Sequence, residues 1–381
     1  MIPGDAVLDA FLNANILFLV AFALWRVARL GLDRTGLKHA YATQLKLLNT
    51  VFLAIVFSPF LILGLTAMQT QLLGQGANVT LSDMVVAYYL NGGFEMKASE
   101  FERLLSLRDT FTADVMRAGS WVALAAIGAF MIGLAIGTVR LVFSMFCLHK
   151  IVTASYAWRR FGRVHLRLSD RTLVPFSTRG WRNYYVVIPS HMLTNAEEMQ
   201  VSIAHEFQHL RQGDIEWEIL LEALKPFFFL NPAYHAWKRQ VEDLRELSCD
   251  QQVLTTGRIE IKAYCDTLLS VCQQTLRRDR TFVVAVPKVT LVTADRSALR
   301  DGKMSFLEQR ITTLFDARML RYPKLVYAAM MVPLMGAVMF TAMAIQSPGD
   351  WSHDRLMLST VVNLERLDEI NRLSTFGRVR N

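Results

Sequence analysis

Three residues near the middle of the chain have the types and the spacing of a metal-dependent hydrolase. The HEFQH sequence at 205–209 puts His205 and His209 four residues apart, so both imidazoles share one face of a helix. Zn²⁺ held by two imidazoles lowers the pKa of its bound water towards 7, and Glu206 is placed to take the water's proton. The motif predicts zinc-dependent hydrolysis, although an HExxH string alone also occurs by chance.

A catalytic zinc needs a third protein ligand, and the sequence offers several acids for it. They lie in a segment that begins with a helix-start signal, Asn231-Pro232, and contains no later Gly or Pro up to residue 250. Glu246 and Asp250 would share a helix face, so Glu246 could bind zinc while Asp250 accepts the other N–H of a ligand histidine. Spacing alone does not choose among the candidates, which could also be solvated charges paired with arginines. These acids are Glu242, Asp243, Glu246 and Asp250, and the arginines are Arg239 and Arg245.

The elements that must position these residues are expected to be mostly helical. Thr194 or Asn195 is placed to cap a helix that carries the HEFQH motif. A small sheet is predicted near residues 164–189, and we expect the strand near Tyr184–Ile188 to hold a substrate by β-addition. The segment 149–324 is therefore predicted to form an α+β zinc peptidase domain.

Long uncharged segments indicate that the domain is part of a membrane protein. The 381 residues are 52% hydrophobic and 19% charged, which excludes a disordered chain, a disulfide scaffold and a secreted soluble enzyme. A helix of roughly 20 apolar residues crosses the roughly 30 Å of hydrocarbon in a bilayer. Four segments meet this requirement and predict a four-span helical membrane protein: Ala6–Trp25, Leu47–Met68, Trp121–Val139 and Leu325–Ile345.

The distribution of charge predicts the orientation. Residues 26–46 hold five basic residues and one acid, and residues 149–324 hold 26 basic and 19 acidic residues. The positive-inside rule puts both segments in the cytoplasm and both termini outside, so the net charge of +8 needs no direct nucleic-acid partner. The predicted divisions are 1–68 (first two membrane helices and their cytoplasmic loop), 69–118 (extracytoplasmic loop), 119–148 (third helix), 149–324 (cytoplasmic peptidase domain), 325–346 (fourth helix) and 347–381 (extracytoplasmic tail).

Three other features have simple structural explanations. Gly133 and Gly137 form a GxxxG pattern that allows close approach of another helix. The apolar run Phe227–Leu230 is expected to be core, with contact to the inner membrane leaflet as the alternative. Cys249 lies among the candidate site residues, and we expect it to be a small packing residue rather than a nucleophile.

The combined pattern resembles the BlaR/MecR-type membrane zinc metallopeptidases, a gluzincin family that transduces β-lactam resistance. The resemblance rests on HEFQH, on Asp214 five residues after the second histidine, and on the Asn231-Pro232 start of a helix that ends in the ELSCD string at Asp250. The four-span topology is also similar. One difference is the tail 347–381, which is too short for the penicillin-binding sensor of well-known members, so we expect a short form without it.

This resemblance implies a role for each site residue and a cellular location. The family places its active site on the cytoplasmic side of the bacterial inner membrane. The implied zinc ligands are His205, His209 and Glu246, the implied general base is Glu206, and Asp250 and Asp214 are implied as hydrogen-bonding supports of the ligands.

The expected function is that of a regulated signalling endopeptidase. Its expected partners are the lipid bilayer and a cytoplasmic protein substrate, for which the family suggests a transcriptional repressor, and a homo-oligomer is left open. Self-cleavage within Thr275–Thr281 is a further expectation. A housekeeping protease of the HtpX/Ste24 type is an alternative, and so is a non-enzymatic signalling scaffold with a structural zinc, although a structural site would have no use for Glu206.

Overall fold

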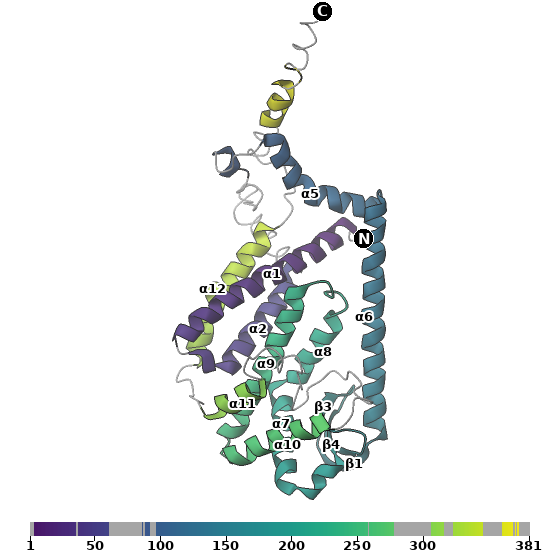
Figure 1. Ribbon diagram of the computed structural model, residues 1–381, viewed down its shortest axis with the longest axis vertical. Coiled ribbons are helices and arrows are strands. Elements are labelled where there is room, and N and C mark those ends of the chain that lie inside the picture. Colours follow the sequence, from purple (N-terminus) through teal and green to yellow (C-terminus); the bar gives the residue numbers. More distant parts are fainter. Residues whose placement is uncertain are drawn as a thin grey trace, which may run out of the picture. The chain divides into compact units, whose positions relative to one another are not determined.

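The computed structural model is mostly helical, with one small sheet, as the sequence predicts (Figure 1). It describes residues 4–35, 37–60, 97–257, 259–277, 306–315 and 323–345, together with positions 86, 88–91, 360–368, 370 and 372. The main helices are α1 (Gly4–Thr35), α2 (Tyr41–Val56), α5 (Ala98–Arg117), α6 (Trp121–Ala154), α7 (Ala196–Gln212), α8 (Asp214–Leu224), α9 (Pro232–Thr255), α10 (Ile261–Arg277), α11 (Phe306–Phe315) and α12 (Pro323–Ala344).

Three helices in the described part of the chain are long and apolar enough to cross a membrane. They are Leu8–Leu32 within α1, Trp121–Ala154, which is α6, and Lys324–Ala344 within α12. The apolar helix α2 has 16 residues, and the predicted second span continues to Met68, beyond the described residues. The second of the four predicted spans and the orientation of the chain therefore remain predictions.

Contacts within the chain divide it into two compact units. The first comprises residues 1–21, 51–131 and 332–381, and it contains a small apolar cluster around Phe101. In this unit the Glu365 carboxylate accepts hydrogen bonds from the backbone N–H groups of Ala98 and Ser99. It thereby satisfies donors that the first turn of α5 leaves free. The second unit comprises residues 22–50 and 132–331 and contains every predicted site residue.

The second unit contains a four-stranded sheet in the order β1-β2-β4-β3. Strands β1 and β2 are antiparallel, β2 and β4 are parallel, and β4 and β3 are antiparallel. The sheet begins before the predicted residue 164, because β1 adds an antiparallel strand to it. The strands are β1 (Tyr156–Phe161), β2 (Val164–Ser169), β3 (Phe176–Arg179) and β4 (Tyr184–Pro189).

The pairing of β4 overturns the expectation that Tyr184–Ile188 receives a substrate strand. Strand β2 pairs with one edge of β4 along its whole length, and β3 pairs with the other edge from Tyr184 to Val187, so β4 is an inner strand of the sheet. Strand β3 ends the sheet on this side and lies against α7 and α8. The edge strand next to the HEFQH helix is therefore β3.

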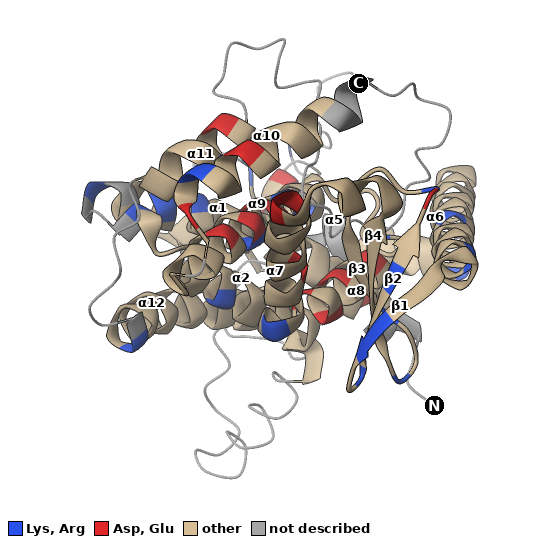
Figure 2. Ribbon diagram, turned by 90° about the horizontal axis from the view of Figure 1, so that it is seen from below, with Lys and Arg blue, Asp and Glu red and all other residues tan. Residues whose placement is uncertain are grey.

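One apolar core fixes α7 relative to the sheet and the later helices. Buried side chains from β4, α7, α9, α10 and α11 meet in it, so residues that are far apart in sequence hold the site helices together. Acidic positions lie on α7, α8 and α9, whereas basic positions follow β1 (Figure 2). Representative core residues are Ile188, Val201, Val253, Leu268 and Leu314.

Candidate active site

Helix α7 carries the three residues of the HEFQH motif. The Asn195 side chain caps its N-terminus by accepting a hydrogen bond from the Glu198 N–H, which confirms one of the two predicted caps. At the other end Gly213 adopts a left-handed conformation, with φ of 72°, which ends the helix and starts α8. Side chains 205, 206 and 209 are all completely buried.

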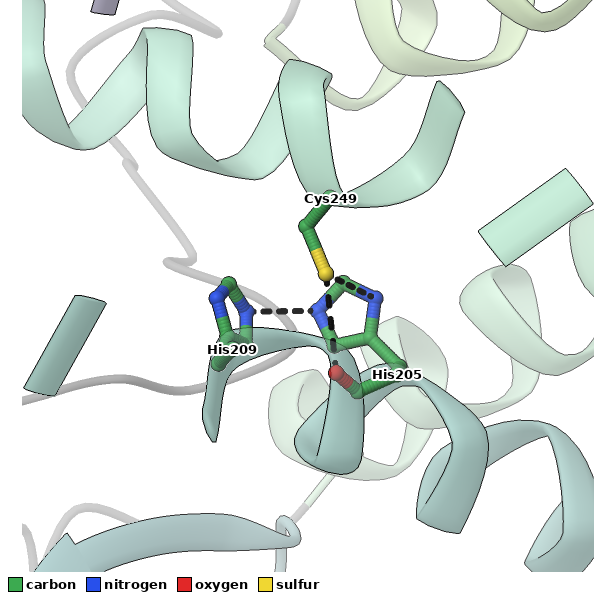
Figure 3. A group of neighbouring side chains, drawn as sticks. All are labelled: His205, His209 and Cys249. Atoms are coloured by element: carbon green, nitrogen blue, oxygen red, sulfur yellow. Dashed lines mark hydrogen bonds between the residues drawn. The ribbon is translucent and has the colours of Figure 1, made fainter. Parts of the chain in front are cut away.

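Glu246 on α9 faces both motif histidines. Asn231 caps this helix through the N–H groups of Ala233 and Tyr234, as its position before Pro232 predicts. The two histidine Nε2 atoms lie 3.0 Å apart (Figure 3). One oxygen of Glu246 is 3.6 Å from His205 Nε2, and the other is 3.6 Å from His209 Nε2.

The Nδ1 atom of each histidine has a hydrogen-bond acceptor. His209 Nδ1 is 2.7 Å from Asp214 Oδ2, and His205 Nδ1 is 2.7 Å from the Tyr264 hydroxyl oxygen. This hydroxyl donates its proton to Asp250 Oδ1, 2.6 Å away, so its oxygen is left to accept one from His205. Asp250 itself is 3.4 Å from His205 Nδ1. In the neutral form of each ring, these acceptors favour the tautomer with the proton on Nδ1 and a lone pair on Nε2.

This protonation makes the centre of the site suitable for a cation. Two Nε2 lone pairs and the Glu246 carboxylate converge in a region that excludes water. Such groups repel one another unless a positive charge lies between them. Neutral imidazole nitrogen and carboxylate oxygen are the ligands of catalytic zinc sites, so the residues present fit a divalent metal.

Cys249 forms an alternative metal-binding group with the two histidines. Ligand atoms of His205, His209 and Cys249 all lie within 4.8 Å of one another. However, Cys249 Sγ lies 3.6 Å from His205 Nδ1, the nitrogen that faces Tyr264, and 3.5 Å from the His205 carbonyl oxygen (Figure 3). Burial raises the pKa of this thiol well above its usual value, so it remains protonated. Its position in the apolar core is that of a packing residue.

Glu206 lies beside the histidine pair without a hydrogen bond. Neither carboxylate oxygen has a partner within the described residues, and both are buried. Burial raises the pKa of Glu206 to about 7. Ser177 of the edge strand β3 lies close enough to affect that pKa. A carboxylate with this pKa can both accept and release a proton near neutral pH.

Arg310 on α11 supports the acids of α9, and no sequence motif marks it. Its Nε and one terminal nitrogen each lie 2.6 Å from an oxygen of Asp250, and its other terminal nitrogen is 3.1 Å from Glu246 Oε2. Burial alone would raise the pKa of Glu246, but the Arg310 guanidinium holds it well below its usual range. Arg310 therefore keeps Glu246 ionised and fixed in position.

The remaining acids on α9 are separated from the histidine pair. Glu242 pairs with Lys238, one turn earlier on the same helix. Arg245 pairs with Glu218 of α8 at 2.8 Å rather than with the acids that follow it. Glu246 and Asp250 are buried, so the interpretation of these two as solvated helix charges is wrong.

Arg310→Met is expected to lower the free energy of unfolding by about 3–5 kcal/mol, because it leaves two buried carboxylates without their cation. Thermal unfolding of the purified protein in detergent measures this loss. Arg211→Met is the control at an exposed position on α7, and there the expected change is within about 0.5 kcal/mol. Equal stability of the two variants would contradict the role given to Arg310.

Comparison with known proteins assigns the chain to a family. No curated protein matches the chain. The family model of the BlaR1 peptidase M56 matches residues 6–292, which is more than half of the chain and includes α7 and α9. Arg310 lies beyond the matched region. Together with the candidate membrane helices and the buried metal-binding group, this match shows that the chain is a membrane-associated metallopeptidase and belongs to the BlaR1 peptidase M56 family.

Proposed function

We propose that the protein is a zinc endopeptidase in which His205, His209 and Glu246 bind the metal. The observation that carries the proposal is the convergence of two histidine lone pairs on one carboxylate in a buried site. Glu246 is preferred to Cys249 as the third ligand because its oxygens face the Nε2 atoms, whereas the thiol lies near Nδ1 of His205. Asp214, and Asp250 through Tyr264, orient the rings.

Glu206 is the proposed general base and, later, the general acid. The bound metal would supply Lewis acidity to polarise the scissile carbonyl and to acidify the attacking water. Glu206 takes the proton of that water and delivers it to the leaving amine, and its raised pKa suits both steps. Neither of its carboxylate oxygens has a hydrogen-bond partner among the described residues, which supports this role.

The edge strand β3 is the proposed binding surface for the substrate backbone. An extended segment of a protein substrate would pair with β3 and extend the sheet by one strand. Two observations support this position: β3 ends the sheet beside α7, and Ser177 of β3 lies near Glu206. The carbonyl groups of an extended main chain bound there would lie near the general base, Glu206.

The proposed biological role is that of a regulated signalling protease at the bacterial inner membrane. Its substrate would be a cytoplasmic protein, with a transcriptional repressor as the candidate that the family suggests. Self-cleavage within Thr275–Thr281 is part of this proposal. Helix α10 ends at Arg277, and residues 278–281 lie outside the described residues.

Comparison of newly formed peptide N-termini in cells that carry the wild type or Glu206→Gln tests this role. We expect cytoplasmic protein fragments that depend on Glu206, together with a fragment of the protein itself that starts within the 275–281 window. Identical sets of fragments in both cells would refute a signalling protease. Cleavage of substrates without the fragment from the window would refute self-cleavage alone.

Reporter fusions test the proposed orientation. A reporter fused after Arg300 is expected to behave as cytoplasmic, because the basic residues of 26–46 and 149–324 should remain inside. Reporters at Gly76 and Asn381 are expected to behave as extracytoplasmic. An extracytoplasmic result at Arg300 would place the active site in the other compartment and would exclude a cytoplasmic substrate.

A further inference from the structure

The loop between α8 and α9 packs against two glycines of α6. A Cβ atom added at Gly133 would lie 2.2 Å from the ring of Phe229, and one added at Gly137 would lie 3.1 Å from Pro226. Contacts of this kind are possible only where the helix has no side chain. The GxxxG pattern therefore receives the loop at residues 225–230 of the same unit, rather than another membrane-spanning helix.

The position of these glycines along α6 sets the depth of the loop. Gly133 is twelve residues from Trp121, at the start of the apolar run, which corresponds to about 18 Å along the helix. Charge first appears after Val139, at Arg140. If α6 crosses a bilayer with roughly 30 Å of hydrocarbon, Gly133 lies within the hydrocarbon layer, and so does the ring of Phe229 that touches it.

We propose that the α8–α9 hairpin is re-entrant and that residues 225–230 are inserted among lipid acyl chains beside α6 (Figure 1). The large apolar side chains that the described residues leave exposed suit this environment. Phe227 is 49% exposed and Leu230 is 72% exposed, and Ile219 on α8 is also exposed. Large apolar side chains exposed next to an apolar helix are what an acyl-chain environment favours.

Several polar groups of the loop backbone have partners within the hairpin. Non-helical backbone inside a membrane is tolerated when its polar groups find partners within the protein. The N–H groups of Lys225, Phe227 and Phe228 donate to the carbonyl oxygens of Glu222 and Leu224. The Phe228 carbonyl accepts from the Asn231 N–H, and the Phe229 carbonyl accepts from the His235 side chain. Pro226 has no N–H to satisfy.

The charges near the tip are also paired within the hairpin. Lys238 of α9 lies 3.0 Å from both Glu218 and Glu222 of α8, and it also contacts Glu242. Lys225, next to the loop, pairs with Glu222 at 3.6 Å. Charged groups at membrane depth are expected to pair with one another in this way. The proposal rests on α6 crossing the bilayer, and it is independent of the metal and of the peptidase activity.

The insertion also fixes the distance between the active site and the membrane. Glu246 lies fifteen residues beyond Asn231 along α9, or about 22 Å from the loop. Since the loop is inside the hydrocarbon layer, this length brings the active site close to the membrane surface. A protein substrate would then be cut where the bilayer meets the solvent.

Nitroxide labels on the full-length protein in lipid vesicles test the insertion. Cysteines are introduced at Phe227 and Leu230 in a background in which Cys147, Cys265 and Cys272 are alanine, while the buried Cys249 is retained. Collision rates are measured with oxygen, which concentrates in lipid, and with a water-soluble nickel chelate. Trp181→Cys, at a position that is 95% exposed in the turn between β3 and β4, is the control for contact with water.

We expect the ratio of oxygen to nickel collisions to be at least about tenfold higher at positions 227 and 230 than at 181. Equal ratios at all three positions would overturn the proposal. Low rates with both reagents at 227 and 230 would also overturn it, because protein rather than lipid would then cover the loop.

A matched pair of glycine variants tests the contact between the loop and α6. Gly133→Leu should displace the Phe229 ring. The ratio of oxygen to nickel collisions at position 230 should then fall by at least about threefold. Gly128→Leu should leave the ratio unchanged, because a Cβ atom at Gly128 meets nothing within 4 Å. An unchanged ratio in Gly133→Leu would show that α6 does not hold the loop.

Discussion

Glu206→Gln is expected to lower kcat by at least about 100-fold while the metal content stays at the wild-type level. The amide has nearly the same shape as the carboxylate but cannot take a proton from the attacking water, and general-base catalysis typically contributes a factor of about 10²–10⁴. Cleavage of a peptide substrate by the purified protein gives kcat, and elemental analysis gives metal per chain. Loss of the metal from this variant would show that Glu206 supports the ligands instead of acting as the base.

The same substitution is expected to stabilise the protein after the metal is removed. Burial raises the pKa of Glu206 from 4.5 to about 7, so between these values the native state binds more protons than the unfolded state. Stability of the wild type therefore falls as the pH rises from 4.5 to 7. At pH 8, the free energy of unfolding of Glu206→Gln should exceed that of the wild type by on the order of 3 kcal/mol. This difference should shrink as the pH falls. Glu242→Gln, at a partly exposed position on α9, is the control substitution.

Glu246→Ala is expected to reduce the bound metal from about one ion per chain to a small fraction of that value. The reason is that a catalytic site depends on its third protein ligand, and both oxygens of Glu246 face the histidine Nε2 atoms. Glu242→Ala and Cys249→Ala are the matched controls on the same helix, and both should retain the metal. Metal measured after dialysis against a weak chelator separates these outcomes.

Each control excludes a different ligand set. Loss of metal in Cys249→Ala, with retention in Glu246→Ala, would establish the His205, His209 and Cys249 group as the site. Loss of metal in Glu242→Ala would mean that α9 presents a different face to α7.

The local part of the fold could be predicted from the sequence, because it depends on residues close together along the chain. Asn195 and Asn231 cap their helices through N–H groups two or three residues away, and such short-range bonds leave a recognisable pattern. The four-residue spacing of His205 and His209 likewise predicted their shared helix face. The small sheet was also predicted, although β1 begins before the expected range.

The contacts between distant segments could not be predicted in the same way. Tyr264 hydrogen-bonds to His205, 59 residues earlier, and Arg310 binds Asp250, 60 residues earlier, so neither lies at a spacing that identifies it. The error in assigning the substrate strand has the same origin. The apolar sequence of β4 shows that it is a buried strand, but only the pairing order shows that β2 and β3 occupy both of its edges.

The position of Arg310 near the end of the chain determines when the active site is completed during protein synthesis. The ribosome makes the chain from its N-terminus, so the motif of α7 and the acids of α9 leave the ribosome well before α11 does. During that interval Glu246 and Asp250 lack the guanidinium that binds both of them in the finished protein. The nascent peptidase is thus expected to stay incomplete until α11 has docked, which would spare neighbouring nascent chains from premature cutting.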